Sequence, residues 1–494
     1  MTLKGVLKKI FFRLITLTLC TVILTPAPSF ASAPRPDRKV FVHLFEWKWS
    51  DVAIECEKFL GPKGFAAVQV SPPNEHALLP GHPWYQRYQP VSYQLISRSG
   101  TRAEFADMVK RCKASNVDVY VDAVINHMTW VNRSGSTKYG SAKSPYDEYL
   151  YPGTYQPWDF HRCGRNGDDS IANYHDRWEV QNCNVTTCAD LNTGAEYVRT
   201  RLASYLNDLL SLGVAGFRID AAKHMHFADL QAILGRLNKG AYIFQEVIDF
   251  GYEPIKSDEY FPTGDVTEFR YSRNLARIFY NGKLSWLNSF GQDWNFIPAS
   301  KAVVFVDNHD IQRGHGGGGE VITHKDPETY ILATTFMLAW PYGYPQVMSS
   351  YSFQDPSQGP PNHEGGKTKP VYDNNVLQCG KEWQCEHRWE PISNMVMFRN
   401  VTSETSINNW WSNGNNQIAF GRGNKGFVAI NKEDKPMNHV LQTEMPAGNY
   451  CDVISGSVKR QECTGQIVTV TSSGKVDLKV GARRAIAIHI GSRI

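Results

Sequence analysis

The feature that most constrains the fold is a repeated alternation of short apolar segments with amphipathic ones, from about residue 39 to residue 349. The apolar segments are expected to be strands: 39–45, 66–71, 117–127, 216–220, 241–247, 301–310 and around 346–349. Helical patterns lie between them, at about 50–60, 101–116, 196–212, 227–237 and 329–338. Strands that are apolar throughout predict a parallel sheet covered on both faces. About eight such units favour a (β/α)₈ TIM barrel over a doubly wound sheet.

Two segments depart from this alternation. Residues 128–189 are rich in Gly, Tyr, Asp and Asn with little helical period, and ordinary loops in such a fold are only a few residues long. We therefore expect an inserted small domain there, after the third strand, between the barrel segments 34–127 and 190–394. From 395 to 494, alternating apolar and polar residues between turns predict a C-terminal antiparallel β domain.

Residues 1–33 are expected to be a signal peptide that is cleaved near Ala31 or Ala33. An apolar run at 10–24 is preceded or interrupted by four basic residues: Lys4, Lys8, Lys9 and Arg13. A membrane anchor is the weaker alternative, because Arg13 interrupts a run that is already short for a bilayer span. We therefore predict a secreted, extracellular protein with no membrane partner once the leader is removed.

The charge balance gives no case for a nucleic-acid partner. The 52 basic and 48 acidic residues give a net charge of +4, and all four leader charges are positive, so the mature chain is close to neutral. We expect a monomer.

Cysteine usage fits export. Of ten cysteines, Cys20 leaves with the leader and nine remain. Most of these should pair in an oxidising compartment, but an odd number leaves one thiol free, and the residues alone do not fix the pairing.

Polar clusters follow four of the predicted strands: "DAVINH" (122–127), "FRIDAAKH" (217–224), "FQEV" (244–247) and "FVDNHD" (305–310). In a (β/α)₈ barrel, chemistry gathers at the carboxyl ends of the strands. We expect Asp220, Glu246 and Asp310 to converge there. Arg218 and Asp220 would point to the same face of one strand, and a lone pair of this kind is more often a structural salt bridge.

These four segments, in this order and spacing, resemble the signature regions of the α-amylase family. The resemblance covers essentially the whole mature chain, and "WYQRYQPVSYQL" (84–95) and "GHGGGG" (314–319) are similar to its animal-type branch, which some bacteria share. It implies that Asp220 is the nucleophile, Glu246 the general acid/base and Asp310 the transition-state stabiliser. It also implies substrate contacts from a set of aromatic, basic and amide side chains: Trp84, Tyr85, Tyr88, Gln89, His127, Arg218, Lys223, His224, His309 and His315.

Both segments also have non-functional interpretations: the aromatic cluster at 84–88 could be core packing, and the glycine run could be a plain linker. Pro83, Arg87 and Gln89 favour an exposed loop for the aromatic residues, which then serve as a sugar platform. The glycine run is expected to form a mobile loop over the cleft.

Retaining cleavage of a glycosidic bond needs an attacking carboxylate and a proton-donating carboxyl, about 5–5.5 Å apart. Their pKa values must be pushed in opposite directions. We expect Arg218 to hold Asp220 ionised, and apolar neighbours and nearby carboxylates to raise the pKa of Glu246.

The resemblance further implies Ca²⁺, held by the side chains of Asn126 and Asp190 and by the backbone carbonyls of Gln181 and His224. Oxygen ligands of mixed origin suit this ion. Relatives in this branch often bind chloride through an Arg, an Asn and a third basic residue. Arg218 and Asn308 match the first two, but the third position is the neutral Gln346, so chloride binding is expected to be weak or absent.

The family pattern implies four disulfides: Cys56–Cys112, Cys163–Cys183, Cys379–Cys385 and Cys451–Cys463. Cys188 then remains as the free thiol. Asn132, Asn184 and Asn400 lie in N-x-S/T sequons, which matter only in a eukaryotic host.

Three functions compete. The first is a secreted α-amylase that cleaves internal α-1,4-glucosidic bonds of starch, glycogen and malto-oligosaccharides through a glycosyl-Asp220 intermediate. The second is a maltogenic or glucan-transferring enzyme of the same family. The third is a non-catalytic glucan-binding relative, which the presence of all three carboxylates disfavours.

Overall fold

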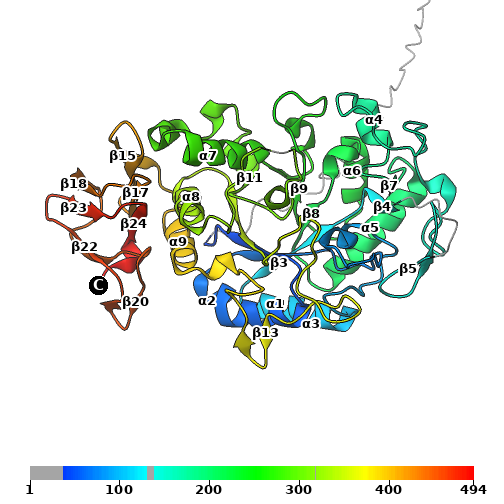
Figure 1. Cartoon of the computed structure of the whole chain (residues 1–494), viewed down its shortest axis with the longest axis horizontal. Coiled ribbons are helices and arrows are strands. Elements are labelled where there is room, and N and C mark those ends of the chain that lie inside the picture. The colour runs from blue at the N-terminus through cyan, green and yellow to red at the C-terminus, as the bar shows by residue number, and fades with distance from the viewer. Residues whose placement is uncertain (1–36, 131–137, 318) are drawn as a thin grey trace, which may run out of the picture.

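The computed structural model describes residues 37–130, 138–317 and 319–494, so the expected leader, Asn132 and one residue of the glycine run lie outside the described residues. Eight parallel strands close into a barrel in the order β1-β12-β11-β10-β9-β8-β3-β2 (Figure 1). The barrel strands are β1 (Phe41–Leu44), β2 (Ala67–Val70), β3 (Asp118–Ala123), β8 (Gly216–Ile219), β9 (Tyr242–Gln245), β10 (Asp265–Thr267), β11 (Ala302–Phe305) and β12 (Tyr344–Ser349). This closed parallel sheet confirms the fold class predicted from the alternating pattern.

The helices that cover the barrel follow from the amphipathic segments. They are α1 (Trp49–Glu55), α3 (Arg102–Ala114), α5 (Glu196–Ser211), α6 (Phe227–Leu234), α7 (Phe269–Asn281), α8 (Pro327–Ala339) and α9 (Glu390–Val401). The first one continues through a π-helical turn, Cys56–Leu60, into the short α2 (Gly61–Lys63). Thr101 and Glu104 form the expected capping box at the start of α3, which satisfies backbone N–H groups at that end.

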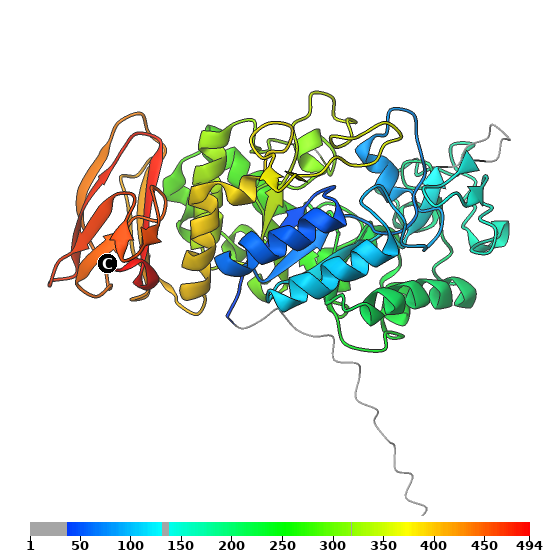
Figure 2. The same cartoon turned by 90° about the horizontal axis from the view of Figure 1, so that it is seen from below.

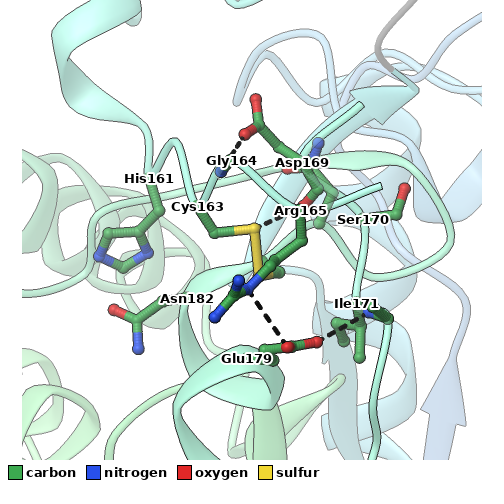
Figure 3. The surroundings of a disulfide bond; sticks show 12 residues. His161, Cys163, Gly164, Arg165, Asp169, Ser170, Ile171, Glu179 and Asn182 are labelled. Carbon is green, nitrogen blue, oxygen red and sulfur yellow. Dashed lines mark hydrogen bonds and ion pairs between the residues drawn. A yellow bond between two sulfur atoms is a disulfide. The ribbon is translucent and has the colours of Figure 1, made fainter. Parts of the chain in front are cut away.

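The segment between β3 and β8 carries the extra structure that its composition predicted. It contains the antiparallel pair β4 (His127–Trp130) and β7 (Cys188–Asp190), the pair β5 (Lys138–Tyr139) and β6 (Pro145–Tyr146), and helix α4 (Arg177–Asn182). With so little regular structure, this segment depends on cross-links. The Cys163–Cys183 disulfide joins its loop to the end of α4, and an Arg165–Glu179 ion pair of 3.3 Å lies beside it (Figure 3).

The C-terminal segment forms two four-stranded antiparallel sheets. One holds β15 (Ile407–Ser412), β16 (Gln417–Arg422), β17 (Gly426–Asn431) and β24 (Arg484–His489), and the other β18 (Met437–Gln442), β23 (Lys475–Val480), β22 (Ile467–Val470) and β19 (Gly448–Cys451). An apolar core that includes Phe427, Met437 and Leu478 lies between them. Both views place these sheets at the opposite end of the molecule from the insertion (Figures 1 and 2).

The expected division between residues 394 and 395 falls inside α9. Since α9 is one continuous helix and the next strand begins only at Ile407, we propose a division after Val401 instead.

Disulfides form between the same four pairs that the resemblance implies, and Cys188 is a buried free thiol. Cys56–Cys112 joins the helical segments that follow β1 and β2. Within the described part of the chain, no helix is long and apolar enough to cross a membrane.

Candidate active site

A cavity of about 390 Å³ opens at the carboxyl ends of the barrel strands. All three predicted carboxyl residues line it, together with nine of the ten predicted substrate-binding residues: Trp84, Tyr85, Tyr88, Gln89, His127, Lys223, His224, His309 and His315. Segments that are far apart in the sequence therefore meet in one cleft.

The tenth residue, Arg218, lies beneath the carboxyl groups and is only 4% exposed. Its guanidinium contacts three carboxyl groups: Nη1 lies 2.8 Å from Asp220 Oδ1 and 2.7 Å from Asp122 Oδ1, and Nη2 lies 3.1 Å from Glu246 Oε1. Asp310 Oδ2 is 4.0 Å from Nη2. One buried cation thus holds the carboxyl groups at the floor of the cavity, which is more than a simple two-residue salt bridge.

Burial raises the pKa of Asp220 to about 6, against the lowering effect of Arg218 and with a further raising effect from Glu246. Arg218 opposes this shift, as expected of a partner that holds Asp220 ionised, but its guanidinium is shared between several acids, and the pKa still lies above that of an ordinary Asp. The pKa of Asp310 is raised well above its usual range by burial and by Glu246.

Glu246 is held by the turn that follows β8. The backbone N–H of Ala221 donates to Glu246 Oε2 at 2.8 Å, and the N–H of Glu246 donates to Ile219 O at 3.0 Å. Ala221 has a φ of 50°, in the left-handed region that a residue with a side chain rarely adopts. This turn orients the N–H that fixes the carboxylate.

Aromatic rings form one wall of the cavity. Tyr88 stacks on the His309 ring with centroids 5.2 Å apart, and Trp84 meets His309 at 5.6 Å and His315 at 5.8 Å. His309 Nε2 also lies 3.3 Å from Asp310 Oδ2. A flat aromatic surface beside paired carboxyl groups is suited to binding and cleaving a sugar chain.

Comparison with known proteins decides the family. Residues 71–238 match the α-amylase catalytic domain, and residues 410–491 match the α-amylase C-terminal all-β domain. An α-amylase of Pecten maximus is 47% identical, over 96% of this chain and 97% of the relative. The chain belongs to the α-amylase family.

Other relatives agree with this assignment to the α-amylase family. A pancreatic α-amylase of Rattus norvegicus is 47% identical, over 92% of this chain and 95% of the relative. Among solved structures, a mutant of α-amylase I of Eisenia fetida in complex with maltohexaose is 43% identical with a TM-score of 0.88, covering 93% of this chain and 99% of that one.

Asp122 was not singled out from the sequence, although it is the first residue of the segment "DAVINH". Asp122 is fully buried, pairs in register with Arg218 and accepts a hydrogen bond from Tyr88 Oη at 2.8 Å. Burial raises its pKa to about 7, with Arg218 opposing the shift and Asp220 adding to it. The sequence signal that could have identified Asp122 is a carboxylate inside a largely apolar strand.

The inserted segment contributes further cavity-lining residues that the sequence did not point to: Trp130, Val185, Thr186 and Cys188. Trp130 stacks on Tyr85 with centroids 5.3 Å apart, so it extends the aromatic wall. These residues reach the cavity only because the insertion packs on the barrel, and no local sequence motif indicates that packing.

The candidate calcium ligands gather where β4 and β7 meet the barrel. Asn126 Nδ2 donates to Asp190 Oδ1 at 3.2 Å, and Asn126 Oδ1 is buried without a hydrogen-bond partner among the described residues. His224 lies in the turn after β8 and bonds through Nδ1 to Val180 O at 2.9 Å, next to Gln181. In the described part of the chain no three His, Cys, Asp or Glu side chains cluster as metal ligands would, so any ion here would have one carboxylate, Asp190, and would otherwise depend on amide and carbonyl oxygens.

The three positions related to chloride binding lie in β8 (Arg218), just after β11 (Asn308) and within β12 (Gln346); β11 and β12 are neighbours in the barrel, and β9 and β10 separate them from β8. Asn308 Oδ1 accepts from the backbone N–H groups of Asp310 and Ile311 at 3.0 and 2.9 Å. The amide of Gln346 donates to Gln69 Oε1, so this buried position supplies no charge.

Proposed function

We propose that this protein hydrolyses internal α-1,4-glucosidic bonds of starch, glycogen and malto-oligosaccharides with retention of configuration. The observation that carries the proposal is the shared contact of Arg218 with Asp220 and Glu246 in an aromatic-walled cleft. Two carboxyl groups held against one cation can act on the same bond. The family membership supports starch as the substrate.

In the first step, the Asp220 carboxylate attacks the anomeric carbon while Glu246 gives its proton to the leaving oxygen, which leaves a glycosyl ester on Asp220. In the second step, Glu246 removes a proton from water, and the water oxygen displaces Asp220 from the sugar. Asp310 would hydrogen-bond hydroxyls of the same sugar and stabilise the transition state. His309, which contacts Asp310, would bind that sugar as well.

Replacement of the proton donor tests this assignment. Glu246→Gln removes the carboxyl but keeps its size, and we expect turnover of soluble starch to fall by about 10²–10⁴-fold. A variant at the exposed Glu404, Glu404→Gln, serves as a control and should match the wild type. Near-normal starch hydrolysis by Glu246→Gln would overturn the assignment of roles.

Calcium fits the site around Asn126. The unpaired buried Oδ1 of Asn126 and the nearby carboxylate of Asp190 are hard oxygen donors, and the Gln181 and His224 carbonyls would complete the set. A bound ion would supply electrostatic cross-linking between the insertion and the turn after β8. We further propose that the protein is secreted, as its animal relatives suggest, and acts as a monomer.

A further inference from the structure

Arg313 follows the catalytic segment by three residues and is only 4% exposed. It ends a short 3₁₀ helix, Ile311–Arg313, and its side chain enters a box of aromatic rings. The guanidinium carbon lies 4.2 Å from the centroid of Phe353, 4.9 Å from Tyr351, 5.1 Å from Phe45 and 5.8 Å from Trp84. Trp84 is also part of the aromatic wall of the cleft.

Arg313 bonds back to the catalytic segment through one side-chain and one backbone hydrogen bond. Arg313 Nη1 donates to His309 O at 2.9 Å, and the backbone N–H of Arg313 donates to Asp310 O at 2.9 Å. These two bonds close a small loop around His309 and Asp310. Only the bond to His309 O comes from the guanidinium; because His309 directly precedes Asp310 and contacts it at 3.3 Å, a shift of that carbonyl would move both residues.

The burial of Arg313 carries a free-energy penalty that a side chain with a packing role alone would not have. Its Nε and Nη2 are buried and have no hydrogen-bond partner among the described residues. Burying a cation with unsatisfied donors is unfavourable, and an apolar side chain in the same box would avoid that penalty. Its charge also attracts the buried carboxyl groups of Asp307 and Glu386, but its close contacts are cation–π contacts and one carbonyl, and these connect a wall of the cleft to the catalytic segment.

We propose that Arg313 is a positioning residue for hydrolysis: it holds His309 and Asp310 in register with the Trp84 wall, although it does not itself line the cleft. This proposal rests on the proposed function. Removing the guanidinium would leave the sugar-binding surface present but the groups at the bond to be cleaved misplaced.

Two substitutions separate this role from simple support of the fold. Arg313→Met keeps an unbranched apolar stem but is shorter and loses the charge and the bond to His309 O. We expect kcat on a malto-oligosaccharide to fall by about 10- to 100-fold, the scale of a small misplacement, with KM changed by less than about threefold. Arg313→Lys keeps a charged donor, and we expect its kcat to exceed that of Arg313→Met by at least about threefold.

Arg399→Met is the matched control. Arg399 is also buried, at 6% exposure, and donates to the Trp340 and Gly343 carbonyls on another side of the barrel. It should lower the thermal unfolding midpoint and leave kcat per folded molecule within about twofold of wild type, because it does not contact the catalytic segment.

α-Maltosyl fluoride identifies the group through which Arg313 acts, because fluoride leaves without a proton from Glu246. The loss in Arg313→Met should persist on this substrate if Arg313 positions His309 and Asp310. Full recovery on the fluoride, or unchanged kcat in both Arg313 variants beside an active wild type, would overturn the proposal. An inactive wild type on both substrates would instead overturn the proposed function itself. If Arg313→Met does not fold, Arg313→Gln, which also lacks the charge, takes its place, and a wild-type kcat in that variant would contradict the proposal.

Discussion

At the residue scale, the pKa of Asp220 sets an expected pH dependence. Burial raises this pKa to about 6, and the nucleophile must be ionised to attack. Below pH 6 the carboxyl is increasingly protonated, so kcat/KM should fall as pH decreases through about 6 and not near pH 4, where an ordinary Asp titrates. Initial rates on a soluble malto-oligosaccharide across pH 4 to 8 measure this acid limb.

Asp122→Asn provides the matched test of that pH profile. Asp122 shares Arg218 and, with a pKa of about 7, is only partly ionised near pH 6, so the substitution removes a fraction of a negative charge there; the pKa of Asp220 should decrease and the acid limb should move slightly to lower pH. An acid limb that stays in place in this variant, or moves upward, would contradict the electrostatic account.

Gln346 leads to a second prediction at this scale. Because it is neutral and its amide is engaged with Gln69, the site lacks the third positive group that anion binding needs. Activity should therefore be unchanged after dialysis into chloride-free buffer. Titrating sodium chloride back at constant ionic strength, with sodium nitrate or acetate as the balancing salts, measures the effect. A large, saturable activation by chloride would show that Gln346 does not prevent binding.

At the scale of elements, most barrel strands and the four polar strand ends were predictable because each combines a strong apolar run with a motif. The sixth strand, β10, was not found, since Asp265–Thr267 is three residues long and its ends are polar. The expected end of the barrel segment falls inside α9 for a related reason: that helix packs on α8 and is buried on several sides, so it lacks a clear amphipathic period. Arg313 and Trp130 could not be predicted as part of the site, because their positions depend on contacts between segments that are distant in the sequence.

The junction of β4 and β7 with the barrel predicts a calcium effect on stability. Chelation of the purified protein should lower the thermal unfolding midpoint and the activity together, because the oxygen donors of Asn126 and Asp190 would lose their shared cation. Calcium should restore both, and magnesium should not, since it requires a smaller and more rigid octahedral site. In Asp190→Asn the midpoint should no longer respond to calcium. A midpoint that ignores both chelator and calcium in the wild type would contradict the site.

At the scale of the whole molecule, the barrel and the C-terminal sheets are joined through α9. The buried Asn394 donates from Nδ2 to Val453 O at 3.0 Å and to Gly456 O at 2.8 Å, and it accepts from Lys63 Nζ at 2.8 Å. One side chain thus connects the helical layer of the barrel to the β domain.

Asn394→Ala should therefore destabilise the molecule without changing its chemistry. Two buried carbonyls lose their donor, which costs about 1–3 kcal/mol of unfolding free energy. We expect a lower midpoint in denaturant and, well below the transition, a kcat on starch equal to that of the wild type. Asn449→Ala is the control, because Asn449 is exposed and, among the described residues, its side chain accepts a hydrogen bond only from Thr469 on the adjacent strand, so the stability should change by less than about 0.5 kcal/mol. If Asn394→Ala were as stable as this control, the β domain would be held to the barrel by the remaining contacts of α8 and α9 and not by this amide.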